Sequence, residues 1–190
     1  MSTKRKVLLD LAVSLDGYIE GPHGEIDWCI MEEEMAFEQF LERVDTILFG
    51  RKSYELFLQF LRNPFLSEED RFMMVTMNSK NKVVFSRSLS GLDDARIISE
   101  NLKEEVEKLL LEPGKDLWLY GGASLIEAFM KEDLVDEYRL SVHPVLLGSG
   151  KSLFTGLMER KNLQLKETKS FPSGVVQLIY EKCAIPGEII

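Results

Sequence analysis

The sequence lacks the features of membrane, secreted and metal-binding proteins. Its two cysteines, Cys29 and Cys183, lie far apart without metal-ligand spacing, which favours reduced thiols over a disulfide framework. No apolar run reaches the roughly 18 residues of a membrane span. The apolar stretch after Lys4–Lys6 resembles a short signal peptide, but Asp10 and Asp16 interrupt it. We therefore expect a cytoplasmic protein without a membrane partner or a bound metal.

Positive charge is also scarce. The chain has 23 Lys and Arg against 32 Asp and Glu, a net charge of −9. Sequence-independent nucleic-acid binding needs basic surface to displace counterions, so we expect no nucleic-acid partner. The net negative charge is still compatible with a small anionic ligand. Charges beyond about 8 Å are screened at physiological salt, so the side chains near the binding site determine whether an anion binds.

Low-complexity composition is absent as well. Of the 190 residues, 45% are apolar and 29% charged, which excludes a disordered chain and allows a sizeable core. We find no linker that would divide the chain. We therefore expect one domain over residues 1–183 and a loose tail over 184–190, which contains a Pro-Gly pair.

Strand and helix patterns alternate over the first two thirds of the chain. The stretch Val7–Leu15 is apolar on both faces and predicts a central strand. Further strands are expected at 46–49, 82–86, 95–99 and 116–120, and helices at 31–44, 53–61, 100–111 and 123–131. The remainder is β-rich, with strands expected at 138–142, 163–170 and 175–181. The pattern predicts an α/β fold with a mixed, mostly parallel central sheet and antiparallel C-terminal strands.

Two strand-to-helix junctions carry residues that suit a phosphate. Gly50 lets backbone approach a ligand, and Arg51 and Lys52 place two cations at a helix start, where the dipole opposes them. Such cations are often retained for an anionic ligand, although side chains that point into solvent explain them equally well. At the second junction, the pair Gly121-Gly122 exposes backbone N–H groups that suit a diphosphate, and a tight packing turn is the alternative.

A third strand end, at Ser86 and Arg87, adds hydroxyls and a cation. The three ends together could hold a dinucleotide that carries an extra phosphate. The fingerprint GxGxxG and the phosphate loop GxxxxGK[ST] are both absent. The loop Gly148–Lys151 follows a β segment, so a hairpin or edge turn is favoured there. His23 and His143 have no ligand spacing around them.

Five stretches, in order, are similar to a known family: VSLDGYIEGPHGEIDW, DTILFGRKSYE, VVFSRSL, LWLYGGASLIEAFM and VDEYRLSVHPVLLGSGKSLF. Together they resemble the dihydrofolate reductase superfamily, and more closely the stand-alone relatives of the riboflavin-biosynthesis reductase domain. In bifunctional riboflavin enzymes that domain follows a deaminase, whose zinc signature (H-x-E with P-C-x-x-C) is missing here. The resemblance covers residues 7–181 and implies a three-layer α/β/α fold with an NADPH site.

The resemblance also implies which residues would contact the cofactor. The nicotinamide would be lined by Ala12, Asp16, Gly17, Tyr18 and Ile19. The adenosine phosphates would be faced by Gly50, Arg51, Lys52 and Ser53. The adenine ribose and its 2′-phosphate would be held by Ser86 and Arg87, and the diphosphate by Gly121, Gly122, Ala123 and Ser124.

Two positions depart from the family pattern. Dihydrofolate reductases carry an acidic residue a few positions after a loop Trp, whereas Asp27 directly precedes Trp28 here. Asp27 and Glu33 are the candidate general acids, since a carboxyl whose pKa is raised by an apolar pocket would suit that role; a solvated surface role is the alternative. Asp10 stands where the riboflavin reductase domain often has a basic residue. An inward Asp10 would contact a cationic or amino-bearing heterocycle, or be satisfied by the backbone.

These observations predict an NADPH-dependent reductase that transfers a hydride to a small heterocyclic substrate, similar to 5-amino-6-(5-phosphoribosylamino)uracil reductase. The alternative is a non-catalytic NADPH- or nucleotide-binding regulatory protein that kept the cofactor site and lost the acid. The cations Arg51, Lys52 and Arg87 predict a preference for NADPH over NADH. The loop 21–26 would act as a mobile cover, and the resemblance suggests a homodimer through the stretch 138–154.

Overall fold

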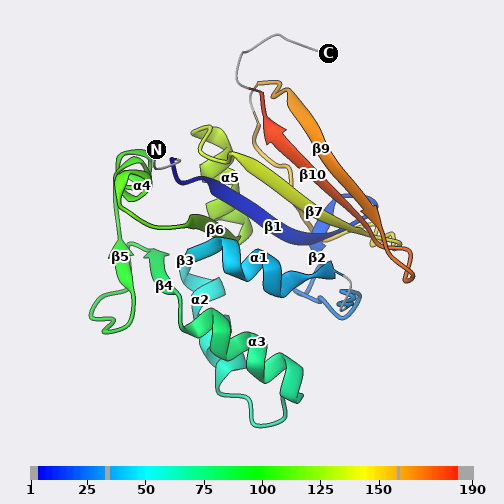
Figure 1. Ribbon diagram of the computed structural model, residues 1–190, viewed down its shortest axis with the longest axis horizontal. Helices are drawn as coiled ribbons and strands as arrows, with labels where there is room; N and C mark the ends of the chain where they lie inside the picture. Colours follow the sequence, from blue (N-terminus) through cyan, green and yellow to red (C-terminus); the bar gives the residue numbers. More distant parts are fainter. Residues whose placement is uncertain (1–3, 33–34, 158, 184–190) are drawn as a thin grey trace. The chain divides into compact units, whose positions relative to one another are not determined.

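The computed structural model of the chain (Figure 1) describes residues 4–32, 35–157 and 159–183. The predicted tail, 184–190, lies outside these residues. The chain forms two compact units, each assembled from separate stretches: unit 1 combines the residues up to Lys6 with Ala36–Leu125, and unit 2 combines Val7–Met35 with the residues from Ile126 onward. The single domain over 1–183 stays a prediction.

Unit 1 is built around four parallel strands. Their order is β5 (Arg96–Ile98), β4 (Asn81–Phe85), β3 (Val44–Gly50) and β6 (Asp116–Gly121). The inner strand β3 pairs in parallel with both β4 and β6. Its residues Ile47, Leu48 and Phe49 are fully buried, as expected for a parallel strand that is covered on both faces.

The described part of unit 1 has the helices α1 (Phe37–Arg43), α2 (Arg51–Leu61), α3 (Glu68–Asn78) and α4 (Leu102–Leu111), and α5 (Ala123–Lys131) leads out of the unit. Along the chain, α1 precedes β3, α2 and α3 lie between β3 and β4, and α4 lies between β5 and β6. Helix α2 starts directly after β3 and buries Tyr54 and Phe57, whose rings lie 5.7 and 5.3 Å from the ring of Phe49. This packing fixes the start of α2 against the end of β3.

Unit 2 combines a parallel and an antiparallel part. Strand β1 (Val7–Ser14) runs parallel to β7 (Glu137–His143), β10 (Val176–Lys182) is antiparallel to β7, and β9 (Leu163–Ser170) is antiparallel to β10. The short strands β2 (Tyr18–Glu20) and β8 (Lys151–Ser152) pair separately. The predicted class, mostly parallel strands with antiparallel strands at the C-terminal end, is confirmed.

The first helix is shorter than expected. The sequence pattern predicts a helix over 31–44 with glutamates in its first turn, but α1 begins at Phe37. Ala36, just before it, has a φ of 52°, in the left-handed region. A right-handed helix cannot continue through this conformation, so the helix does not extend back to residue 31. Met35 instead packs with Phe171 and Val175 in unit 2.

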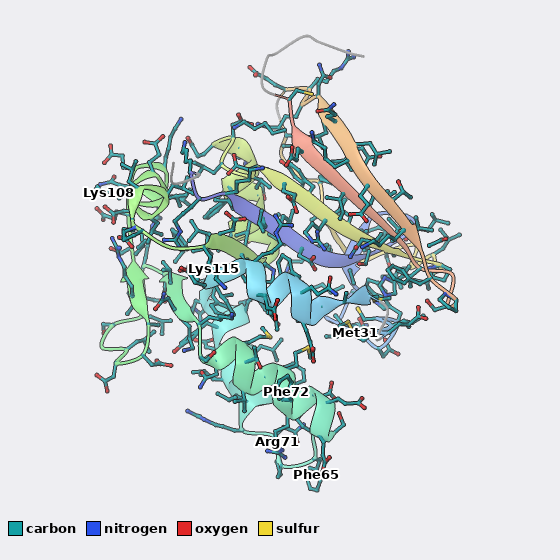
Figure 2. The ribbon with its side chains drawn as sticks, viewed as in Figure 1. Met31, Phe65, Arg71, Phe72, Lys108 and Lys115 are labelled. Carbon is teal, nitrogen blue, oxygen red and sulfur yellow. The ribbon has the colours of Figure 1, made fainter. Side chains whose placement is uncertain are left out.

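Helix α3 and the strands β2 and β8 are not anticipated by the sequence analysis. Ser67 begins α3, because its hydroxyl accepts a hydrogen bond from the N–H of Asp70 at 3.0 Å. Phe65, in the loop before α3, is 91% exposed, and Phe72, on α3, is 60% exposed. Both lie near Arg71 (Figure 2). Among the described residues, no helix is long and apolar enough to cross a membrane.

Candidate functional site

The two glycine junctions of unit 1 lie against each other. A Cβ atom on Gly50 would come within 3.2 Å of the backbone nitrogen of Gly122, and one on Gly122 would come within 3.0 Å of the Ser53 hydroxyl. Both positions therefore need glycine for close approach. The structure brings together Gly50 and Ser53, at the start of α2, with the Gly121-Gly122 pair at the start of α5. These residues are four of those expected at the cofactor phosphates.

The two cations at the start of α2 differ in their surroundings. Arg51 forms an ion pair with Glu55, one turn later, with Nη1 2.9 Å from Oε1. Lys52 is exposed and makes no hydrogen bond or ion pair with any described residue. No acidic residue stands in the first turn of α2. The charge of Lys52 is therefore available to an anion, whereas Glu55 partly neutralises Arg51.

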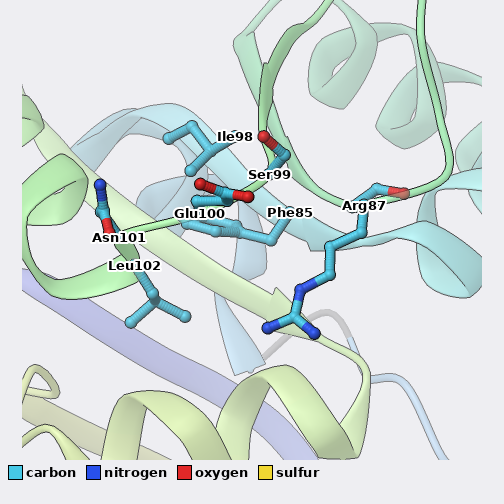
Figure 3. Close-up of a pocket in the computed structure, with 8 residues that line it drawn as sticks. Phe85, Arg87, Ile98, Ser99, Glu100, Asn101 and Leu102 are labelled. Atoms are coloured by element: carbon cyan, nitrogen blue, oxygen red, sulfur yellow. The ribbon is translucent and has the colours of Figure 1, made fainter.

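A pocket of about 240 Å³ opens where β4 and β5 end (Figure 3). Its apolar lining comes from Phe85, Ile98 and Leu102, and its polar lining from Ser86, Arg87, Ser99, Glu100 and Asn101. All these residues belong to unit 1, and α4 begins at the edge of the pocket. The third predicted strand end, at Ser86 and Arg87, therefore forms part of a real hollow in the surface.

The charged groups of this pocket have no partners among the described residues. Arg87 and Glu100 are exposed, and neither forms a hydrogen bond or ion pair with another residue that the structure describes. The Ser86 hydroxyl, in contrast, accepts hydrogen bonds from the N–H groups of Ser88 and Leu89 at 3.2 and 3.1 Å and shapes the loop. The pocket thus offers a free cation and a free carboxylate beside an apolar surface.

The loop after β1, in unit 2, is held by its own side chains. Asp16 accepts hydrogen bonds from the Ser14 hydroxyl at 2.6 Å and from the N–H groups of Leu147 and Gly148 at 3.2 and 2.7 Å. The Ser14 hydroxyl, followed by these N–H groups, lowers the pKa of the Asp16 carboxyl. Asp16 therefore has a structural role in fixing this loop, and its contact with nicotinamide stays a prediction.

The other expected nicotinamide residues lie close by along the chain. Ala12 is in register with Ser141 of β7. The N–H of Tyr18 donates to the Ser14 hydroxyl at 2.9 Å, and the carbonyl of Gly17 accepts from the N–H of Leu153 at 2.9 Å. Ile19 lies in β2, whose neighbour Glu20 pairs with Lys151 at 2.6 Å. Lys151, the first residue of β8, is thus engaged by a carboxylate.

The candidate general acids receive no support from their surroundings. Asp27 is exposed, so it lacks the apolar enclosure that the role requires. Burial, and then the charge of Asp27, raise the pKa of the neighbouring Cys29 thiol to about 11. Glu32 accepts a hydrogen bond from the Ser173 hydroxyl. Glu33 lies outside the described residues, so both acids stay predictions.

A buried ion-pair cluster was missed by the sequence analysis. The Arg139 Nε atom lies 2.8 Å from Asp10 Oδ2, and its Nη1 atom lies 3.5 Å from Glu137 Oε1. Asp10 and Arg139 are register partners on the parallel strands β1 and β7, so both side chains leave the same face. Asp10 therefore meets a protein guanidinium, where the sequence had suggested a ligand or the backbone. An arginine two residues after a glutamate, on the same face of the strand EYRLSVH, was the available signal.

His143 anchors a loop and shows no sign of ligand chemistry. It is buried, and its Nε2 atom accepts the N–H of Ile30 at 2.9 Å, while Nδ1 lies 2.8 Å from the Ser141 carbonyl. Because Nε2 accepts, the ring proton belongs on Nδ1, which donates to that carbonyl. The edge of Trp28 packs on the ring at 5.3 Å. His143 thus fastens residues 28–30 to β7.

Comparison with known sequences supplies a family. The model of the RibD C-terminal domain matches residues 5–177. Two Bacillus subtilis (strain 168) proteins, named uncharacterized protein YyaP and uncharacterized protein YwjB, are 51% identical over 178 residues and 37% identical over 182 residues. Each alignment covers 93% of this chain, with 95% and 98% of the relative.

Comparison with solved structures supplies the fold. A putative riboflavin biosynthesis protein from Shewanella sp. PV-4 is similar with a TM-score of 0.78 and 24% identity, over 94% of this chain and 99% of that one. A Thermotoga maritima diaminohydroxyphosphoribosylaminopyrimidine deaminase/5-amino-6-(5-phosphoribosylamino)uracil reductase has a TM-score of 0.68 and 14% identity, over 95% of this chain and 57% of that one. These matches confirm the dihydrofolate reductase-like three-layer α/β/α fold.

Proposed function

The chain belongs to the RibD C-terminal domain family, and from this membership we propose that it is an NADPH-dependent reductase of a small heterocyclic substrate. The observation that carries the proposal is the pocket of unit 1, where Arg87 pairs with none of the residues that the structure describes. An unpaired guanidinium beside an apolar surface fits a phosphate attached to a nucleoside, because arginine binds phosphate through two parallel hydrogen bonds.

The glycine junctions support a diphosphate in the same unit. Gly50 and Gly122 let the two junctions pack closely, which brings the starts of α2 and α5 together. Backbone N–H groups at helix starts favour negative charge. Lys52 adds a free cation at the first of these helix starts. The residues present therefore fit NADPH, with Arg87 as the expected contact of its 2′-phosphate and the junctions as the expected contacts of its diphosphate.

When bound, NADPH supplies the hydride. The contribution of the chain is orientation and exclusion of water, which would bring the reacting atoms to about 3–3.5 Å. Ala12 and the loop Asp16–Ile19 would line the nicotinamide ring, and the bonds of Asp16 to Ser14 and Gly148 would keep that loop rigid. Pre-organised contacts of this kind lower the entropy lost when the reactants meet.

The ion pairs of Arg139 bear on the substrate class. Its guanidinium is held by Asp10 and Glu137, so its charge is not available to a substrate phosphate. The Thermotoga relative is named as a reductase of a phosphoribosylamino compound. We propose that the substrate of this chain is a heterocycle without a phosphate next to β1, and that a role in riboflavin synthesis does not follow from the fold.

A non-catalytic NADPH-binding protein is the second candidate. It is favoured by the exposure of Asp27, which leaves this carboxyl without the apolar enclosure of a general acid. The two candidates differ in one measurement. A reductase oxidises NADPH in the presence of a panel of pterins, pyrimidines and other small heterocycles, whereas a binding protein holds it unchanged.

Cofactor binding tests the proposal directly. We expect NADPH to change the tryptophan fluorescence of the protein and to bind more tightly than NADH. Arg87→Ala should weaken the binding of NADPH by about tenfold, the equivalent of one charge-assisted hydrogen bond, and leave the binding of NADH nearly unchanged. Lys52→Ala should weaken the binding of both cofactors, because we place Lys52 near the phosphates that they share. Arg71→Ala removes a cation of α3 and serves as the control.

Two results would count against the proposal. Equal losses for NADPH and NADH in Arg87→Ala would remove the 2′-phosphate assignment. If millimolar NADPH changed neither the tryptophan fluorescence nor the melting temperature, the proposal of an NADPH-dependent reductase would be wrong.

A further inference from the structure

The pocket at the ends of β4 and β5 contains a carboxylate that a phosphate does not need. Glu100 lines it together with Arg87, yet it pairs neither with Arg87 nor with any other described residue. In the view of Figure 3, Glu100 and Phe85 lie between Asn101 on one side and Arg87 on the other. The pocket therefore presents opposite charges at different places.

Glu100 is not explained by the helix that follows it. Helix α4 begins at Leu102, and its first turn already holds Glu104 and Glu105 as partners of the helix dipole. Glu105 also pairs with Arg96 and Lys108. Glu100 stands before this turn, on the segment that joins β5 to α4, and lines the pocket. An unpaired carboxylate in such a place suits a ligand that donates hydrogen bonds.

The apolar lining narrows the chemistry of that donor. Phe85, Ile98 and Leu102 offer a surface for a flat ring, and Ile98 is only 5% exposed. A phosphate oxygen would be repelled by Glu100, whereas an amino group on an aromatic ring would donate to it. Adenine has such a group, and hypoxanthine carries an accepting oxygen at the same position.

We propose that Glu100 recognises the amino group of adenine and makes this pocket selective for adenine over hypoxanthine. The inference rests on the proposed function and deepens it, since Arg87 would then recognise the 2′-phosphate while Glu100 recognises the base. The two choices are separate: one residue governs the phosphate, the other the ring. A site built to accept from an amino group rejects the analogue that lacks it, because its carboxylate is left unpaired.

Four dinucleotides test the two choices independently: NADPH, NADH and the hypoxanthine analogue of each. Dissociation constants are measured by fluorescence titration of the whole chain, without turnover. We expect both adenine forms to bind about tenfold more tightly than their hypoxanthine analogues. In Glu100→Gln, whose amide both donates and accepts, this preference should fall to about twofold or less. Arg87→Ala should keep the preference for adenine and lose the preference for the 2′-phosphate.

Glu104→Gln is the matched control, because it removes the same charge one turn further along and outside the pocket. It should leave all four constants unchanged. Thermal melting verifies that each variant is folded.

Three outcomes would overturn the inference while leaving the proposed function intact. The wild type could bind adenine and hypoxanthine forms equally. Glu100→Gln could weaken both bases by the same factor, which would place the carboxylate on a ribose hydroxyl. The variant could also strengthen only the phosphate-bearing forms, which would place Glu100 beside the 2′-phosphate. Failure of all four dinucleotides to bind would instead overturn the proposed function, and the inference with it.

Discussion

Arg139 shows how a single buried charge depends on its neighbours. Its side chain is 11% exposed, and those of Asp10 and Glu137 are 13% and 6% exposed. The cation contacts both anions, which offsets part of the cost of taking three charges out of water. Removal of the cation would leave two carboxylates close together in a medium that solvates them poorly.

Arg139→Met should therefore destabilise the protein by roughly 3–5 kcal/mol, the usual loss when one partner of a buried ion pair is removed. Asp10→Asn should be milder, because Glu137 still faces the guanidinium. Urea unfolding of both variants measures the difference. A loss below about 1 kcal/mol in Arg139→Met would mean that water reaches the cluster freely.

The sequence located candidate residues from their place along one strand and missed contacts that depend on a distant partner. Gly50, Gly122 and Arg87 stand at strand ends, and a strand end can be recognised from a local pattern. Asp10 and Arg139 are 129 residues apart, so their contact follows only from the pairing of β1 with β7. Glu100 gains its interest from the pocket around it, which no local pattern reveals.

At the scale of elements, the start of α1 deserves a direct test. Ala36 has a φ of 52°, where a Cβ atom costs roughly 1–2 kcal/mol. Glycine avoids this contact but loses more backbone freedom on folding. Ala36→Gly should therefore stabilise the protein by about 0.5–1 kcal/mol. Chemical unfolding gives the value.

Ala128→Gly provides the opposite case. Ala128 lies inside α5 with ordinary helical geometry, so glycine there should destabilise by about 1 kcal/mol. Destabilisation of similar size in both variants would show that the left-handed turn at Ala36 is not a feature of the protein in solution.

Most elements followed from hydrophobic pattern and breakers, and the failures have physical reasons. The bounds of α5 and β9 agree with the expected 123–131 and 163–170. Strands β2 and β8 are three and two residues long, too short for an alternating pattern. Helix α3 did carry a signal, Ser67 followed three residues later by Asp70, which is typical of a helix start. Its exposed Phe72 and Val75 obscured the apolar face.

The homodimer expected through 138–154 meets a constraint from the same elements. Strand β7 is paired on one side with β1 and on the other with β10. It has no free edge, so residues 138–143 cannot add backbone hydrogen bonds to a second copy. The exposed large apolar side chains among the described residues of the stretch are those of Leu146 and Phe154. Dimerisation stays a prediction, and it would use these side chains.

For the molecule as a whole, two buried tyrosines and a half-buried cysteine predict a lower free energy of unfolding at alkaline pH. Burial, and the hydrogen bond that its hydroxyl donates to Asp94 at 2.7 Å, raise the pKa of Tyr54 to about 12. Burial also raises the pKa of Tyr138 to about 12 and that of Cys29 to about 11. In the unfolded chain these groups lose their protons near their ordinary values, 10.0 for tyrosine and 9.0 for cysteine.

Between about pH 9 and 12 the folded protein therefore holds protons that the unfolded chain has released. The free energy of unfolding should fall as the pH rises through this window. Urea unfolding at steps from neutral pH to about pH 11 measures the slope. Tyr138→Phe removes one of the three groups and should make the decline shallower. Constant stability across the window would show that the three groups ionise as they do in water.

The two interleaved units have a consequence for biosynthesis. Strand β7, the parallel neighbour of β1, is synthesised about 130 residues after it, since the bond between Val7 and Asp136 spans 129 positions. At the usual speed of translation this delay lasts roughly 6–25 seconds. During that interval the apolar strand β1 is exposed without β7 to pair with. We therefore expect chaperones to bind the nascent chain.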